Sequence, residues 1–241
     1  MTELLFHTDA YLREFEATVT ATDSSRSAIV LDRTAFYAGG GGQPCDTGEI
    51  YAGGKSLDVV KVKKEDDDVV HLLAAGSTLP EEGEKVSGAL DWERRYALMR
   101  THTAMHILCG VVWRDYQAQV TGGNMEPLEG RMDFEFERME RELVEEIEAK
   151  INEEVEAARD VVVRTLPRAE AKQIPDLIRT KINLVPAAIT EIRTVEIVGL
   201  DLQADGGTHV ANTREVGRLR IIDYKSKGRI NKRIRVGLEE S

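Results

Sequence analysis

The chain has 241 residues, of which 41% are hydrophobic and 31% are charged, and its formal net charge at pH 7 is −11. This composition excludes intrinsic disorder, and the length allows one large domain or two small ones, of which we favour two. No apolar run approaches the roughly 18 residues of a membrane span, and residues 1–5 do not resemble a secretory signal, so we expect a cytoplasmic protein.

Residues 1–90 are predicted to form an N-terminal β-barrel domain. Short β-branched and apolar runs recur through this part of the chain, with turn signals between them at Gly53-Gly54 and in the acidic segment 65–68. The expected strands cover residues 27–32, 48–50, 57–62 and 69–73. Regularly spaced short strands of this kind are typical of small barrels.

A run of four glycines, Gly39 to Gly42, lies inside this domain between Tyr37 and the pair Gln43-Pro44. Ordering four consecutive glycines costs much backbone entropy, which favours the close approach of a ligand or of another backbone. A flexible linker is the alternative, although the flanking aromatic residues and proline are unlike linker composition. The run lacks the Lys-Ser/Thr ending of a P-loop, so it does not predict a nucleotide site.

The pattern changes near residue 90, where we place the boundary with a second domain. Asp91 is a suitable N-cap for a helix over residues 92–116, and that helix carries His102 and His106. The i, i+4 spacing puts both imidazoles on one helix face, where they could hold a single metal ion. The alternative is that each histidine is a core residue with its own hydrogen-bond partner.

The second domain, residues 91–241, is predicted to be α+β, with helices packed on an antiparallel sheet. After a glycine-rich connection over residues 121–132, the expected elements are a strand at 132–136, a long amphipathic helix at 138–159, a strand at 160–165, a short helix at 168–179 interrupted by Pro175 and a strand at 190–198. The apolar stripe of the long helix indicates core packing and consists of Leu143, Ile147, Ile151 and Val155.

A second motif, Asp205-Gly-Gly-Thr-His209, follows the last of these strands directly. Its two glycines favour a tight non-helical loop, which could bring Asp205 and His209 back to one point. Together with His102 and His106 the motif offers three imidazoles and one carboxylate. We therefore hypothesise one metal centre built from all four residues.

The C-terminal segment, residues 218–236, is predicted to be a β-hairpin with its turn at residues 225–228. Residues 214–235 contain nine basic and two acidic side chains, whereas residues 133–160 contain four basic and twelve acidic ones. A basic strip can bind a polyanion even on an acidic protein, because salt screens charges beyond about 10 Å. A charged hairpin that is merely solvated is an equally open alternative.

The motifs of the second domain resemble a known family. The motif His102-Thr-Ala-Met-His106, the motif Asp205-Gly-Gly-Thr-His209 and the segments 212–217 and 226–234 resemble, in this order, the editing domain of alanyl-tRNA synthetase. With the glycine-rich stretch before them, the chain resembles free-standing alanyl-tRNA editing proteins of the AlaX type over residues 34–236. The expected fold is therefore a small N-terminal β-barrel followed by an α+β editing domain.

The chain departs from the family pattern at Asp205, where that pattern commonly has a cysteine. Both side chains are anionic when bound, and a carboxylate oxygen is an accepted zinc ligand, so we expect one Zn²⁺ ion per chain. A hard oxygen in place of a soft thiolate weakens the preference for zinc over other first-row ions. A site of three histidines with an exchangeable water, without Asp205, stays open.

The resemblance implies hydrolysis of the ester that links a wrong amino acid, mainly serine and also glycine, to the tRNA for alanine. The expected catalytic residues Thr34 and Gln43 match, by position, polar residues of the family's substrate pocket, and Thr34 is expected to contact the serine hydroxyl. Backbone N–H groups of the glycine-rich loop could stabilise the carbonyl oxyanion. Further contacts are assigned to the substrate at Gly40, Gly41, Gly42 and Thr208, and to tRNA at Arg218, Lys227, Arg229, Lys232 and Arg233.

Two other functions fit the motifs without the resemblance. A metal-dependent hydrolase of another small ester or amide would need the same metal ligands. A tRNA-binding module with a structural metal would also fit, since four protein ligands close the coordination sphere of zinc.

Overall fold

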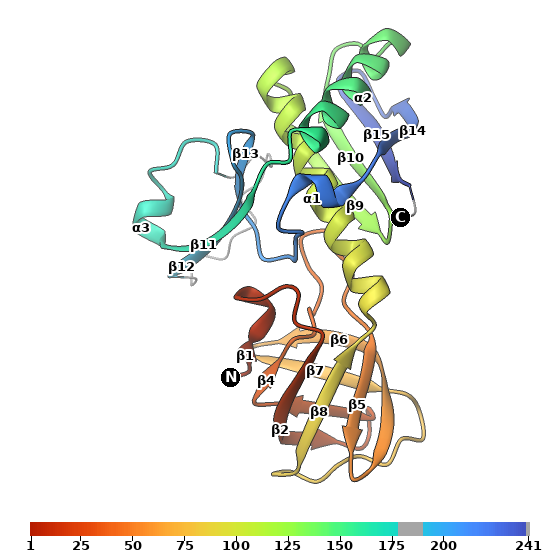
Figure 1. Cartoon of the computed structure of the whole chain (residues 1–241), viewed down its shortest axis with the longest axis vertical. Helices are drawn as coiled ribbons and strands as arrows, with labels where there is room; N and C mark the ends of the chain where they lie inside the picture. The colour runs from red at the N-terminus through yellow and green to blue at the C-terminus, as the bar shows by residue number, and fades with distance from the viewer. Residues whose placement is uncertain (178–189, 240–241) are drawn as a thin grey trace. The chain divides into compact units, whose positions relative to one another are not determined.

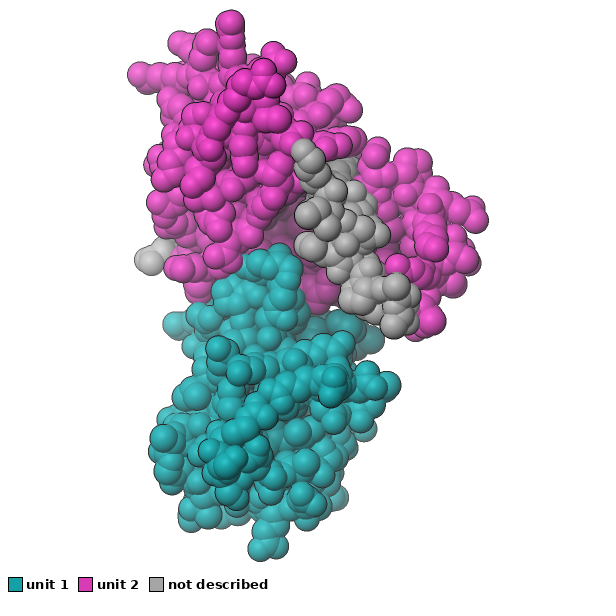
Figure 2. Space-filling view, turned by 180° about the vertical axis from the view of Figure 1, so that it is seen from behind, with its two compact units in different colours: residues 1–97 teal, residues 98–241 magenta. Residues whose placement is uncertain are grey.

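The computed structural model describes residues 1–177 and 190–239. The fold is α+β, as expected, and the chain divides into two compact units, Met1–Ala97 and Leu98–Ser241 (Figures 1 and 2). Within the described ranges, none of the helices has the length and apolar character needed to cross a membrane.

The first unit contains a closed six-stranded barrel, which confirms the predicted architecture. Its strands follow one another around the barrel in the order β2 (Glu14–Asp23), β3 (Ala28–Leu31), β7 (Asp68–Leu73), β6 (Lys55–Glu65), β5 (Gly48–Ala52) and β8 (Lys85–Leu90). All neighbours in the barrel are antiparallel. Outside it, β1 (Glu3–Leu4) pairs in parallel with β4 (Arg33–Thr34), and the 3₁₀ helix η1 covers Leu5–His7.

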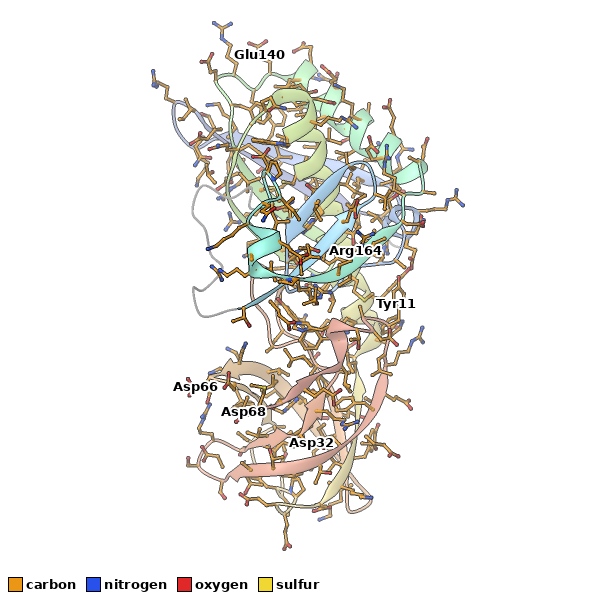
Figure 3. All side chains as sticks on the ribbon, turned by 90° about the vertical axis from the view of Figure 1, so that its left-hand side faces the viewer. Tyr11, Asp32, Asp66, Asp68, Glu140 and Arg164 are labelled. Atoms are coloured by element: carbon orange, nitrogen blue, oxygen red, sulfur yellow. The ribbon has the colours of Figure 1, made fainter. Side chains whose placement is uncertain are left out.

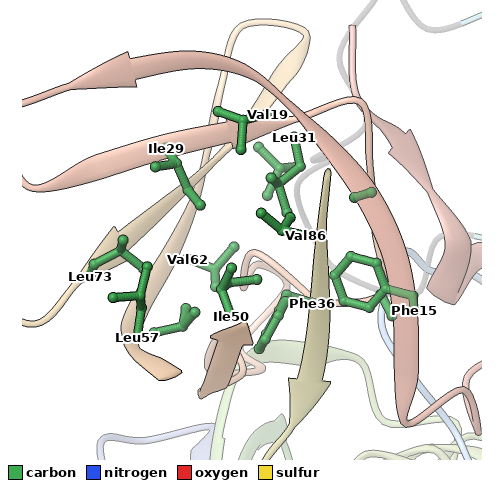
Figure 4. Close-up of a cluster of buried hydrophobic side chains, with 14 of the residues drawn as sticks. Phe15, Val19, Ile29, Leu31, Phe36, Ile50, Leu57, Val62, Leu73 and Val86 are labelled. Atoms are coloured by element: carbon green, nitrogen blue, oxygen red, sulfur yellow. The ribbon is translucent and has the colours of Figure 1, made fainter. Parts of the chain in front are cut away.

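Alternation of side chains along the strands fills the barrel. Phe15, Ala17 and Val19 of β2 are buried, with exposed or half-buried residues between them. They join apolar residues from the other strands in one cluster (Figure 4). In this cluster the rings of Phe15 and Phe36 pack edge to face, with their centroids 5.8 Å apart. The acidic turn between β6 and β7 carries Asp66 and lies away from this cluster, at the surface (Figure 3).

The second unit is built around the antiparallel sheet β14-β15-β10-β9. Its elements are α1 (Trp92–Tyr116), which begins in the first unit, β9 (Val120–Glu126), β10 (Glu129–Glu135), α2 (Arg141–Glu156), the 3₁₀ helix η2 (Thr213–Val216), β14 (Leu219–Ser226) and β15 (Asn231–Leu238). The predicted helix over residues 92–116 and the C-terminal hairpin are confirmed. Asp91 caps α1 as expected, because its carboxylate accepts a bond of 3.1 Å from the Arg94 N–H.

Both helices pack on this sheet. Gly130 of β10 lies so close to Met105 of α1 that a Cβ atom there would meet the sulfur at 2.4 Å. The side-chain amide of Asn152 on α2 bonds to both the N–H and the C=O of Leu219 on β14. The apolar stripe of α2 is buried at Val144, Ile147, Ile151 and Val155, so its first member is Val144 rather than the half-buried Leu143.

Three predictions about regular structure are wrong in detail. Residues 120–126 are not a glycine-rich connection but strand β9, because backbone pairing with β10 needs no apolar pattern. Helix α2 covers Arg141–Glu156 and is shorter than predicted at both ends. Helix α3 covers only Arg168–Ala171, since the proline at 175 disfavours helical backbone before it; residues 178 and 179 of the predicted helix lie outside the described residues.

A second sheet, of three strands, carries the segment that leads to the Asp205 motif. It consists of β11 (Val161–Pro167), β12 (Glu191–Ile197) and β13 (Asp201–Ala204), in that order. The strand predicted at residues 190–198 does not run directly into Asp205. Instead the chain turns at Gly199, which has a φ of 76°, and returns as β13 antiparallel to β12.

Candidate metal centre

The structure brings the four predicted metal ligands together in the second unit. His102 and His106 come from one face of α1, and Asp205 and His209 come from the loop after β13. One ligand atom from each residue can be chosen so that all four lie within 4.8 Å of one another. The three histidines are buried and Asp205 is half-buried, so the group is largely shielded from solvent.

The imidazole nitrogens converge on the Asp205 carboxylate. Its oxygens lie 3.1 Å from Nε2 of His209, 3.4 Å from Nε2 of His102 and 3.8 Å from Nε2 of His106. In a tetrahedral zinc site with bonds of about 2.0–2.1 Å, the ligand atoms lie about 3.3 Å apart. The spacing and the donor set of three nitrogens and one carboxylate oxygen therefore fit a zinc-sized cation.

Outer contacts hold two of these imidazoles. Nδ1 of His106 lies 3.0 Å from the Asp201 carboxylate, which also accepts a bond of 2.6 Å from the Gln203 amide. Nδ1 of His209 lies 3.3 Å from the Thr103 hydroxyl. A carboxylate behind a histidine ligand is a recurrent feature of zinc sites, because it orients the ring and makes the ligating nitrogen more basic.

Gly110 explains how the segment after β12 reaches the histidine helix. It lies one turn after His106, and a Cβ atom there would be 2.9 Å from Leu200 and 3.1 Å from Asp201. Any larger residue would push this segment away from α1. The missing side chain thus allows Asp201 to contact His106 and brings the following Asp205 loop to the same place.

Asp201, Thr103 and Gly110 were not identified from the sequence. The only signal for Asp201 is that it is an acidic residue four positions before Asp205. The turn at Gly199, which brings Asp201 to His106, is not indicated by the sequence pattern. Thr103 and Gly110 lie on the histidine helix as common residue types. Their roles depend on which segment packs against the helix.

The charge states of Asp205 and His209 favour cation binding, whereas His106 must first lose a proton. Burial raises the pKa of Asp205, but the charge of His102 and hydrogen bonds from three imidazoles hold it well below its usual range. Burial and the neighbouring His102 lower the pKa of His209, so that imidazole is neutral at pH 7. Burial lowers the pKa of His106, but its bonds with Asp201 and Asp205 outweigh burial and raise it to about 9. Asp205 and His209 are thus already in the forms that bind metal.

The glycine-rich loop of the first unit is a closed turn rather than an extended linker. Gly40 and Gln43 pair through two backbone hydrogen bonds of 3.0 and 2.9 Å. All four glycines have positive φ values between 58° and 141°. Residues with a Cβ atom rarely adopt this backbone, so the conformation itself accounts for the run. Gly40 and Gly41 are exposed and Gly42 is half-buried.

The predicted substrate residues Thr34 and Gln43 are buried in the same unit. The Thr34 hydroxyl lies 2.8 Å from Nε2 of His71 and accepts a bond of 3.1 Å from the Phe36 N–H. Burial lowers the pKa of His71 to about 4, so that ring is neutral at pH 7. Thr208, in the second unit, is fully buried. That the loop lies against the metal ligands stays a prediction.

A buried ion pair that the sequence did not suggest holds both ends of the glycine-rich loop. The guanidinium of Arg95, in the first turn of α1, forms an ion pair with the carboxylate of Asp46. It also donates a hydrogen bond of 2.5 Å to the carbonyl of Ala35. Asp46 in turn accepts a bond of 2.6 Å from the Tyr37 N–H. Arg95 and Asp46 are both 0% exposed. The pair therefore ties residues before and after the loop to the helix that leads to His102.

The cations of the C-terminal hairpin differ in what they offer a partner. Lys232 is buried, and its ammonium donates to the carbonyls of Gly228 and Arg229 at 2.8 Å. Arg233 makes two bonds of 2.7 and 2.8 Å with the Asp133 carboxylate. The other predicted tRNA contacts, Arg218, Lys227 and Arg229, are exposed.

Comparison with known proteins places this arrangement in a family. Residues 5–94 match the family model of class II (A) tRNA synthetases, and residues 192–235 match that of the threonyl and alanyl tRNA synthetase second additional domain. An alanyl-tRNA editing protein AlaX-M of Saccharolobus solfataricus is 38% identical over 97% of this chain and 98% of its own length. The chain belongs to the AlaX-M family of alanyl-tRNA editing proteins.

Other relatives agree with this assignment. The AlaX-M protein of Methanosarcina mazei is also 38% identical, over 97% of this chain and 95% of its own length. The alanine–tRNA ligase of Ignicoccus hospitalis is 40% identical over 93% of this chain but only 24% of the ligase. An AlaX-M chain thus corresponds to one segment of a much longer synthetase. The resemblance drawn from the histidine motifs is confirmed.

Proposed function

We propose that this AlaX-M protein hydrolyses the ester bond of tRNA(Ala) wrongly charged with serine, and with glycine as a second substrate, releasing the free amino acid and tRNA. The observation that carries the proposal is the convergence of His102, His106, Asp205 and His209 on one point in a member of an alanyl-tRNA editing family. The donor set fits Zn²⁺, one ion per chain. When bound, such an ion supplies Lewis acidity toward an ester carbonyl or acidifies a water molecule.

The chain's own residues supply orientation and selectivity in this proposal. The Thr34 oxygen accepts one bond from Phe36 N–H and exchanges another with His71, so it has capacity for one further partner. We assign that capacity to the serine hydroxyl. A buried site that hydrogen-bonds a hydroxyl rejects the analogue that lacks it by more than size alone allows, which would protect correctly charged Ala-tRNA.

The glycine-rich loop is assigned to the reacting carbonyl. Gly40, Gly41 and Gly42 carry no side chains, so backbone N–H groups there can approach an oxyanion closely. Gly41 has no heavy atom within 4 Å of the position a Cβ atom would take, which leaves room for a ligand. We assign Gln43 and Thr208 to the same substrate.

The deacylation assay tests the proposed function. Purified protein is given Ser-tRNA, Gly-tRNA and Ala-tRNA, all made with tRNA(Ala), and release of the amino acid is followed with time. We expect fast release of serine, slower release of glycine and no release of alanine above the rate without protein. The same assay after removal of metal by a chelator should show no activity, and added Zn²⁺ should restore it.

The assay also separates the alternative functions. Binding of tRNA without hydrolysis of any charged form would show a binding module with a structural metal. Hydrolysis of simple amino acid esters with no preference for tRNA would show a general esterase. Either result would contradict the editing proposal.

For the tRNA surface we propose the exposed cations of the hairpin. The double variant Lys227→Glu with Arg229→Glu should weaken tRNA binding, because two cations near phosphates become anions. The slope of log K against log salt concentration should fall by roughly 1 to 2, since each phosphate contact contributes about 0.7 to 0.9. Binding is measured by filter retention at several salt concentrations.

The matched control makes the same charge change elsewhere. Lys55 and Lys61 are exposed residues of β6 in the barrel. The variant Lys55→Glu with Lys61→Glu should bind tRNA with the wild-type salt slope. Equal weakening by both pairs would mean that the hairpin has no special role.

A further inference from the structure

We propose that His71 is a positioning residue that determines specificity, because its imidazole holds the Thr34 hydroxyl in the orientation that meets the hydroxyl of a seryl ester. His71 lies on β7 of the barrel and is fully buried. Thr34 ends β4, shortly before the glycine-rich loop. The inference rests on the proposed function, since it deepens the contact assigned there between Thr34 and the serine side chain.

His71 is a polar side chain in apolar surroundings. Val69 and Leu73, two positions before and after it on β7, belong to the core cluster of the barrel. The imidazole packs edge to face against the ring of Phe36, with the centroids 5.5 Å apart. Its Nδ1 is buried without a hydrogen bond of good geometry to any described residue. An apolar side chain would fill this position without burying that nitrogen, so packing alone does not account for a histidine here.

The hydrogen bond with Thr34 is what the imidazole adds at this position. Nε2 of His71 lies 2.8 Å from the Thr34 hydroxyl, and both residues are 0% exposed. Burial lowers the pKa of the ring to about 4, so at pH 7 the bond joins two neutral groups. Because water is excluded from both partners, it cannot readily replace either of them. The bond therefore ties the segment before the glycine-rich loop to the wall of the barrel.

The two contacts of the Thr34 hydroxyl leave one direction open. A hydroxyl donates one hydrogen bond and accepts two. The Phe36 N–H takes one acceptor direction at 3.1 Å, and His71 takes a second direction. If Thr34 donates to His71, a lone pair remains for the serine proton; if the ring donates, the Thr34 proton remains for the serine oxygen. Without His71 the hydroxyl could rotate between two open directions, and the fixed orientation would be lost.

The test compares His71→Gln with His71→Asn and His71→Leu. The glutamine amide can reach the place of Nε2 and keep the bond to Thr34, whereas the asparagine amide is one methylene shorter and leucine has no polar atom. The value of kcat/KM is measured for Ser-tRNA and Gly-tRNA, both made with tRNA(Ala), and the effect is expressed as the ratio of the two values. A glycyl ester has no hydroxyl, so damage to metal binding, tRNA binding or ester chemistry cancels in this ratio. Thermal unfolding shows that each variant is folded.

We expect His71→Asn and His71→Leu each to lower the ratio of the serine value to the glycine value by about 10-fold, the effect of one lost hydrogen bond in a buried site. His71→Gln should keep most of the wild-type ratio. Thr34→Val should lower the ratio at least as far as His71→Leu. In the Thr34→Val background His71→Leu should lower it no further, because both residues act through one contact.

Two results would overturn the role of His71. One is a wild-type ratio in the folded asparagine or leucine variant. The other is an equal loss in all three variants, which would mean that His71 acts through packing and not through its hydrogen bond. If the wild-type protein hydrolysed neither ester, the proposed function itself would be overturned, and the role of His71 with it.

Discussion

We expect His102→Ala and His209→Ala each to lose bound zinc and deacylation activity together. Each variant takes one nitrogen from a group whose four ligand atoms lie within 4.8 Å. The loss of zinc affinity should exceed the roughly 100-fold that marks the upper end for outer-shell partners, because a direct ligand is lost. Metal content of the purified protein is measured by elemental mass spectrometry, and activity by release of serine from Ser-tRNA.

The control for this prediction is His7→Ala. His7 belongs to η1 of the first unit and is not one of the four predicted ligands, so this variant should keep one equivalent of zinc. If either ligand variant also retained a full equivalent of metal, the four residues would not form one shared site.

Variants of Asp205 test whether this residue binds the metal ion or only lies beside the three histidines that do. Asp205→Cys restores the donor that the family commonly has, and a thiolate is a softer ligand than a carboxylate. If Asp205 is a ligand, the cysteine variant should bind zinc at least as tightly as the wild-type protein. Weaker binding would favour a site of three histidines without Asp205.

Arg95→Ala should destabilise the protein by about 3–5 kcal/mol, because it leaves the Asp46 carboxylate buried without its counter-ion. Both residues are 0% exposed, and Arg95 also donates to the carbonyls of Ala10 and Ala35. The free energy of unfolding is measured by urea denaturation followed by circular dichroism. The loss should fall on the cooperative unit that contains the barrel.

An exposed pair of similar chemistry provides the comparison. Arg141 and Glu145 on α2 are bonded at 2.6 Å, with side chains that are 79% and 62% exposed. Arg141→Ala should therefore leave the free energy of unfolding almost unchanged. A loss below about 1 kcal/mol for Arg95→Ala would mean that water reaches Asp46 and that the pair does not tie the glycine-rich loop to α1.

Much of the candidate site could be predicted because its signals are local. The i, i+4 spacing of His102 and His106 has the same meaning on any helix, and α1 forms where the pattern indicated. The four glycines indicated an unusual backbone conformation, and each of them has a positive φ. In contrast, the tRNA cations were selected by charge alone, which cannot distinguish exposed Lys227 from buried Lys232.

The sequence by itself determined the residues that carry the chemistry: two histidines on one helix face, a carboxylate and a third histidine around a glycine pair, and a run of glycines before them. Only the tertiary structure decided which residues support them. Asp201 reaches His106 because Gly199 turns the chain and Gly110 lets it approach α1. Such contacts join segments about a hundred residues apart. Their energy depends on burial and on the direction of the hydrogen bonds, and the local spacing of residues in the sequence determines neither.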